Sequence, residues 1–185
     1  ARGMGLPVER LIIATNANDV LHKALSEGVY GRQELVHSLS PSMDISVSSN
    51  FERLLFDLYD RDGEAITGLM GQFDAGDVSF SPDAMARARA LFSSCRVDDA
   101  ATRAQIASTW EHCEYLLDPH TAIGLHAAQA ESLPAALPVI TLATAHPAKF
   151  PDAVEAATGR FWALFSPFEC IRVALISNLL ETRLT

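Results

Sequence analysis

The chain has 185 residues, of which 49% are hydrophobic and 20% are charged, a balance typical of one globular domain or a large piece of a longer protein. Its formal net charge of −9 gives no bulk attraction to nucleic acid or to an anionic membrane. No stretch approaches the length of a membrane span. The three cysteines, Cys95, Cys113 and Cys170, lack zinc-site or disulfide-framework spacing, and this usage predicts a reducing, cytoplasmic location with no metal site.

The first strong element is a strand over residues 10–15, RLIIAT, followed at once by polar residues. Asn18 is predicted to cap a helix over 19–27 that ends at Gly28. A strand, a polar turn and a helix in this order form the opening of a βα unit, so the pattern predicts an α/β protein.

The next elements are predicted to be a loop and several helices. Residues 40–50 are rich in serine and aspartate and predict an extended loop, after which Ser49 and Glu52 have capping-box spacing for a helix over 51–60. Start signals then predict helices over 65–73, 82–92, 98–113 and 119–132.

A second strand is predicted near the end of this pattern. The apolar run at 138–143 is too short for most helices and predicts a buried strand, followed by a helix over 151–157 that closes at Gly159. Thr144 and His146 lie at the end of this strand as Thr15 and Asn16 lie at the end of the first. Since ligands of open α/β sheets bind outside the carboxyl ends of strands, these residues are candidates for one crevice, although helix capping alone also explains them.

Four segments carry a resemblance to a known family. ATNANDVL, SPSMDISVSSNFERLLF, YLLDPHTAIG and LATAHPAKFPDAV occur in the order and at the intervals found in the C-terminal part of threonine synthase. The chain resembles that family from Ala1 to about Gly159. The resemblance implies part of a three-layer α/β domain of the tryptophan-synthase-β-like fold, which is fold type II of the pyridoxal-phosphate enzymes, with a helical insertion over about 50–117.

The resemblance also implies a reaction and its site residues. Threonine synthase uses pyridoxal 5'-phosphate to convert O-phospho-L-homoserine and water to L-threonine and phosphate, the last step of threonine biosynthesis. By the family pattern, the Thr144 hydroxyl donates to the cofactor's pyridine nitrogen, beside the small Ala143 and the cofactor-edge candidate His146. Substrate-side candidates are Asn16, Asp19, His120 and Lys149.

Plainer interpretations of several of these residues remain open. His146 is equally well explained as a turn histidine bonded to backbone, and Lys149 as a solvated charge before a helix. His120 lies in the first turn of its predicted helix, where a polar residue needs no ligand. The remaining histidines show no metal-ligand spacing.

Two parts that such an enzyme needs are predicted to lie upstream. The Schiff-base lysine has no counterpart here, because Lys23 is predicted to be mid-helix and Lys149 does not match the family's cofactor lysine. The glycine-rich loop for the cofactor phosphate is also expected upstream of residue 1. We therefore expect that the chain works with an N-terminal portion of the same protein and is inactive alone.

Residues 160–185 depart from the family pattern and predict a divergent, apolar tail. Two alternatives to threonine synthase stay open at this point. One is a related pyridoxal-phosphate phospholyase that acts on another phosphorylated amino acid, and the other is a non-catalytic truncated fragment or pseudogene product.

Overall fold

The computed structural model describes residues 1–134 and 136–159 and divides the chain into two compact units. The first unit combines Ala1–His37 with Met43–Arg96, and the second combines Ser38–Ser42 with the chain from Val97 onward. The divergent tail predicted over 160–185 lies outside the described residues.

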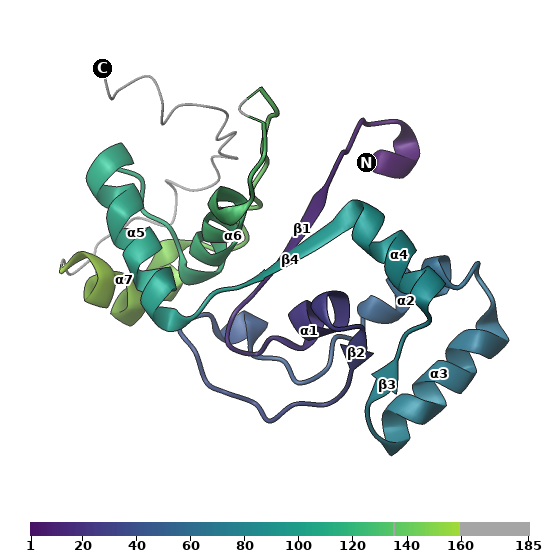
Figure 1. Ribbon diagram of the computed structural model, residues 1–185. Helices are drawn as coiled ribbons and strands as arrows, with labels where there is room; N and C mark the ends of the chain where they lie inside the picture. Colours follow the sequence, from purple (N-terminus) through teal and green to yellow (C-terminus); the bar gives the residue numbers. More distant parts are fainter. Residues whose placement is uncertain (135, 160–185) are drawn as a thin grey trace. The chain divides into compact units, whose positions relative to one another are not determined.

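The first unit is built on a parallel pair of strands. β1 (Leu11–Thr15) lies beside β4 (Phe92–Arg96), with Leu11 opposite Phe92 and Thr15 opposite Arg96 (Figure 1). The strand predicted over 10–15 is confirmed. The sequence analysis missed β4, because FSSCR has neither the apolar run nor the alternation that marks a strand.

Helix α1 (Val20–Ser26) follows β1 and contacts both strands of the pair. Its predicted end is confirmed by Gly28, whose φ of 78° lies in the left-handed region that glycine tolerates best. The predicted cap at Asn18 is wrong. The N-cap position belongs to Asp19, which makes no side-chain cap bond, because the Asn18 side chain hydrogen-bonds instead to Val36 and Asp44.

A second, antiparallel pair joins β2 (Val29–Tyr30) to β3 (Val78–Ser79), with helices α2 (Phe51–Leu58) and α3 (Gly63–Ala75) between them in the chain. Aromatic rings form the centre of this region, and the rings of Tyr30 and Phe73 stack with centroids 4.7 Å apart. The sequence therefore supplies a local apolar core away from the parallel strands.

The helices of this region begin differently from the sequence prediction. The predicted capping box of Ser49 and Glu52 is wrong, because Asn50 is the N-cap of α2 and no side chain caps it. Helix α3 is longer than the predicted 65–73, since Asp62 accepts hydrogen bonds from two amides at its start. Helix α4 (Pro82–Leu91) begins after Ser81 as predicted. Residues 50–117, predicted as a helical insertion, thus include β3 and β4 as well as helices.

The second unit is helical in its described part. Helices α5 (Asp99–Cys113), α6 (Pro119–Ala130) and α7 (Pro151–Thr158) match the predicted helices closely, and α5 contacts both of the others (Figure 1). Asp98 caps α5 by accepting from the Ala101 amide at 2.8 Å, and Gly159 closes α7 with a φ of 67°. Ile106 and Leu125 lie in the core between these helices.

The strand predicted over 138–143 is wrong for the described structure. These residues belong to no strand pair, and Ile140 and Leu142 are 59% and 74% exposed. The physical reason is that a strand exists only through hydrogen bonds to a neighbour, and no described residue supplies one to this segment. The exposed positions still alternate with half-buried Val139 and Thr141, the period of an extended strand.

Short 3-10 turns complete the described elements: η1 (Arg2–Met4), η2 (Pro41–Met43) and η3 (Pro147–Lys149). Among residues 1–134 and 136–159, no helix is both long enough and apolar enough to cross a bilayer.

Candidate functional site

The segment that carries Thr144 lies against helix α6. A side-chain carbon added to Gly124 would lie only 3.1 Å from the Cγ2 methyl of Thr141, so the absence of a side chain at Gly124 lets the two backbones approach closely. Three residues further along, the backbone N–H of Thr144 donates to the hydroxyl oxygen of Thr121 on α6 at 3.3 Å. The site is thus anchored on the first two turns of this helix.

Thr144 is an exposed residue of this segment. Its side chain is exposed, and no hydrogen bond to that hydroxyl is formed by the residues that the structure describes. The neighbouring Ala143 is also exposed, and Ala145 is half-buried. The arrangement offers a hydroxyl donor flanked by methyl groups, on a backbone that α6 holds in place.

Asp118 lies beneath this segment and is 1% exposed. Its Oδ1 accepts from the backbone N–H of His120 at 2.9 Å and of Thr121 at 3.4 Å, which caps α6. Its Oδ2 accepts the hydroxyl proton of Thr121 in a short hydrogen bond. A single buried carboxylate therefore both starts the helix and holds the side chain to which Thr144 is bound.

His120 is buried in the same network. Its Nδ1 lies 2.9 Å from Oδ1 of Asp118, and its Nε2 accepts from the backbone N–H of Ser42 at 3.1 Å. The neutral tautomer with the proton on Nδ1 satisfies both hydrogen bonds at once. The ring also packs on Phe150, with centroids 4.7 Å apart. His120 holds the Ser38–Ser42 segment in place, and its predicted substrate-side role is not tested by this arrangement.

His146 and Lys149 lie in and beside the turn η3. The Nδ1 of His146 accepts from the Ala148 amide at 3.0 Å, which is the backbone-bonded turn histidine foreseen as the plainer interpretation. This bond places the proton of a neutral ring on Nε2. Lys149 is exposed, and its backbone N–H donates to the His146 carbonyl at 3.0 Å.

The two candidates of the first unit follow strand β1. Asn16 is 1% exposed and donates from its amide to Asp44 at 2.8 Å. Asp19 lies 3.5 Å from the ammonium of Lys23 and 3.4 Å from the guanidinium of Arg96, which leaves this carboxylate paired with two cations. These candidates belong to the first unit, whereas Thr144 belongs to the second.

Sequence reasoning missed Asp44, Asp118 and Thr121 as parts of these networks. Neither Asp118 nor Thr121 is among the site residues predicted from the sequence. The signal for the second pair was present, because an N-cap aspartate followed three residues later by threonine allows the two side chains to meet on the first turn. No comparable local signal links Asp44 to Asn16, which lies 28 positions earlier.

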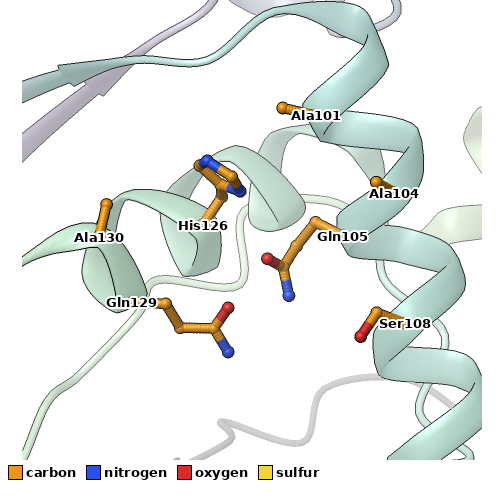
Figure 2. A pocket seen from close by; sticks show the side chains of 7 residues that line it. All are labelled: Ala101, Ala104, Gln105, Ser108, His126, Gln129 and Ala130. Carbon is orange, nitrogen blue, oxygen red and sulfur yellow. The ribbon is translucent and has the colours of Figure 1, made fainter.

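A separate hollow lies between α5 and α6 in the second unit and contains none of the predicted site residues (Figure 2). It is lined by small and uncharged polar side chains together with one histidine: Ala101, Ala104, Gln105, Ser108, His126, Gln129 and Ala130. Across the described ranges, no cluster of three or more His, Cys, Asp or Glu residues has the geometry to hold a metal ion.

Comparison with known proteins shows similarity to threonine synthases. The family model described as "Threonine synthase, C-terminal" matches residues 121–179. The threonine synthase of Pseudomonas aeruginosa is 52% identical over 158 residues, which cover 85% of this chain and 34% of that protein. The resemblance to the C-terminal part of threonine synthase is confirmed.

Solved structures agree with this assignment. PLP-bound threonine synthase from Brucella melitensis is 47% identical, with a TM-score of 0.84 over 87% of this chain and 35% of its own. Threonine synthase from yeast is 37% identical, with a TM-score of 0.82 over 89% of this chain and 36% of its own. The predicted fold class is therefore confirmed, and the chain spans about a third of the length of the threonine synthases it matches.

Proposed function

We propose that this chain is the C-terminal part of a threonine synthase that converts O-phospho-L-homoserine and water to L-threonine and phosphate with pyridoxal 5'-phosphate. The observation that carries the proposal is the exposed Thr144, on a segment anchored to the buried Thr121 and Asp118. An N-terminal portion of the same protein would supply the cofactor lysine and the phosphate loop. A cytoplasmic location is part of the proposal.

The residues present suit one edge of this cofactor. When bound, pyridoxal phosphate supplies an electron sink for carbanionic chemistry. The Thr144 hydroxyl is an uncharged donor, so it can hydrogen-bond the pyridine nitrogen without protonating it, which moderates the sink. Ala143 and Ala145 carry only methyl groups and leave room for a flat ring beside the backbone. His146, with its Nε2 proton directed away from the Ala148 bond, is a further polar group for this edge.

The substrate side is proposed from four residues. Lys149 carries an exposed ammonium, which suits an anionic group of a phosphorylated amino acid. Asn16 and Asp19 are held by Asp44 and by two cations respectively, so each would bind substrate from a fixed position. His120 would act through the Ser42 backbone rather than through a free ring nitrogen.

The decisive experiment uses the complete polypeptide that contains this chain and measures phosphate release from O-phospho-L-homoserine together with threonine formation. We expect both products in equal amounts, and neither from the 185-residue chain alone. Release of phosphate from a different phosphorylated amino acid, with none from this substrate, would instead indicate a related phospholyase. Inactivity of the complete polypeptide on all of these would indicate a non-catalytic protein.

The role of Thr144 has its own test in the same polypeptide. Thr144→Val removes the hydroxyl and keeps the shape of the side chain, so cofactor binding should weaken by about 1–3 kcal/mol, the cost of leaving a buried acceptor unpaired. Thr144→Ser retains the hydroxyl and should restore most of the affinity. Unchanged affinity and turnover in Thr144→Val would show that another residue meets the pyridine nitrogen.

A further inference from the structure

The direction of the hydrogen bonds around Thr121 is fixed by the chemistry of its partners. A carboxylate oxygen can only accept, so the single hydroxyl proton of Thr121 is donated to Oδ2 of Asp118. The lone pairs of the same oxygen then face the backbone N–H of Thr144, 3.3 Å away. Thr121 is 6% exposed and Asp118 is 1% exposed, so water has little access to compete for either bond.

Only one of the two oxygen atoms of the Asp118 carboxylate takes part in capping α6. Oδ1 accepts the two amide protons at the start of α6 and lies 2.9 Å from Nδ1 of His120. Oδ2 has no part in the cap and is bound by the Thr121 hydroxyl. An asparagine or serine would be sufficient for a cap. The second oxygen therefore serves the link to Thr144.

The segment that carries Thr144 is held to α6 by few other interactions. Residues 138–145 form no strand pair, and within the described ranges the bond from Thr144 to Thr121 is the one hydrogen bond that ties them to α6. The close approach of Thr141 to Gly124 fixes the segment's distance from the helix but not its rotation. A directional bond at the Thr144 N–H fixes the orientation of that residue's backbone, and hence the direction of its side chain.

We propose that Thr121, held by Asp118, is a positioning residue that directs the Thr144 hydroxyl toward the pyridine nitrogen of the cofactor. This inference rests on the proposed role of Thr144. Thr121 touches neither cofactor nor substrate in this proposal, and all of its effect passes through Thr144. The carboxylate of Asp118 orients the Thr121 hydroxyl so that it accepts from the Thr144 amide instead of competing with it as a second donor.

The test uses Thr121→Val in the complete polypeptide, with Thr121→Ser to restore the hydroxyl. Thr102→Val is the matched control, because Thr102, like Thr121, is a buried threonine on a helix. The Thr102 hydroxyl donates to the backbone carbonyl of Asp98 at 2.8 Å and has no hydrogen bond to Thr144. The first readout is hydrogen exchange of the Thr144 amide in the cofactor-free protein. We expect exchange to accelerate about tenfold in Thr121→Val, consistent with the loss of one hydrogen bond, and to stay at the wild-type rate in Thr121→Ser and Thr102→Val.

The second readout is the dissociation constant for pyridoxal phosphate in a double-mutant cycle with Thr144→Val. Thr121→Val alone should weaken binding about 5- to 10-fold, the scale of one neutral hydrogen bond, and should add nothing in the Thr144→Val background, because a positioning residue has no effect once its target is gone. Full additivity would overturn the proposal, since a purely structural role adds to Thr144→Val. Unchanged amide exchange in Thr121→Val would overturn it as well.

The same variants distinguish a wrong role for Thr144 from a wrong role for Thr121. If Thr144→Val alone leaves the dissociation constant unchanged, Thr144 is not the partner of the pyridine nitrogen, and the inference falls with it whatever Thr121→Val does. If Thr144→Val weakens binding while Thr121→Val does not, the assignment of Thr144 stands and the positioning role is wrong.

Discussion

The side-chain amide of Asn16 donates to Oδ1 of Asp44 at 2.8 Å, which joins the end of β1 to a loop residue 28 positions later. The amide of Asn18 donates to the same oxygen at 3.0 Å, and its Nδ2 also lies 3.2 Å from Oδ1 of Asn16. Asn16 and Asn18 are 1% and 4% exposed. One carboxylate oxygen thus satisfies two buried amides, and these bonds hold Asp44 beside the end of the strand within the first unit.

Asp44→Ala should destabilise the protein strongly, because it removes an acceptor that two buried amides share. We expect the free energy of unfolding to fall by about 2–4 kcal/mol, measured by urea denaturation. Asp57→Ala is the matched control: Asp57 pairs with Arg61 at 3.0 Å on an exposed helical surface, where the loss should be below about 0.5 kcal/mol. Equal effects of the two substitutions would contradict the importance of the Asn16–Asp44 contact.

Tyr30 should give the protein a characteristic loss of stability at alkaline pH. Its ring is buried, and this burial raises the pKa of the phenol above its usual value near 10. As the pH rises, the phenol of Tyr30 ionises in the unfolded chain before it ionises in the folded protein. The contribution of Tyr30 to the free energy of unfolding is therefore fully present below about pH 10 and is lost as the pH rises through the pKa of the folded state. Tyr30→Phe should flatten this decline in the free energy of unfolding.

The same substitution has a separate cost at neutral pH. The Tyr30 hydroxyl donates to the Ser48 carbonyl at 3.2 Å and accepts from the Ser48 amide at 3.1 Å, so its removal should cost about 1–2 kcal/mol at pH 7. Tyr59→Phe serves as the control, because it removes another phenol that accepts a backbone amide, that of Ser81, and leaves Tyr30 in place. Parallel stability curves for wild type and Tyr30→Phe between pH 8 and 11 would contradict the burial argument.

The elements that the sequence predicted well are those whose signals are local. Asp98 and Asp118 each precede their helix by one position, and in both cases the capping bond lies within three residues along the chain. Gly28 and Gly159 end their helices with positive φ, again a property of one residue. Such signals are complete in the sequence, because both partners of each bond lie within one helical turn.

The errors occur where a partner lies far along the chain. β4 begins 77 positions after the last residue of β1, and neither its composition nor its period distinguishes it from a helix end. Residues 138–143 have the composition of a strand, yet pairing depends on a neighbour that the segment itself does not encode. The site network follows the same rule: Thr144 was predicted through the family resemblance, whereas its bond to Thr121, 23 positions away, was not.

The two lysines give a direct test of where the cofactor is attached. Lys23 pairs with Asp19 at 3.5 Å, and Lys149 is exposed beside η3. We expect that treating the 185-residue chain with pyridoxal phosphate and borohydride gives no stoichiometric adduct at either lysine, by peptide mass mapping. The same treatment of the complete polypeptide should label one lysine upstream of Ala1. A stoichiometric adduct on Lys149 would contradict the proposal that the attachment site lies outside this chain.

The exposed face of residues 138–143 makes a final prediction about the chain on its own. Ile140 and Leu142 are 59% and 74% exposed, so replacing both by serine removes little buried area and should change the free energy of unfolding by less than about 0.5 kcal/mol. Ile123 is 1% exposed on α6, and Ile123→Ala should cost about 2–5 kcal/mol by creating a cavity.

Self-association of the isolated chain should depend on the exposed Ile140 and Leu142, although these residues contribute little to the free energy of unfolding. Two large exposed apolar side chains on a segment without a strand partner favour association between copies, and serine at both positions removes that attraction. Sedimentation velocity of the isolated chain should therefore show fewer oligomers for the double serine variant than for wild type at equal concentration. If the double serine variant instead loses as much stability as Ile123→Ala, then Ile140 and Leu142 are packed in solution and are not exposed.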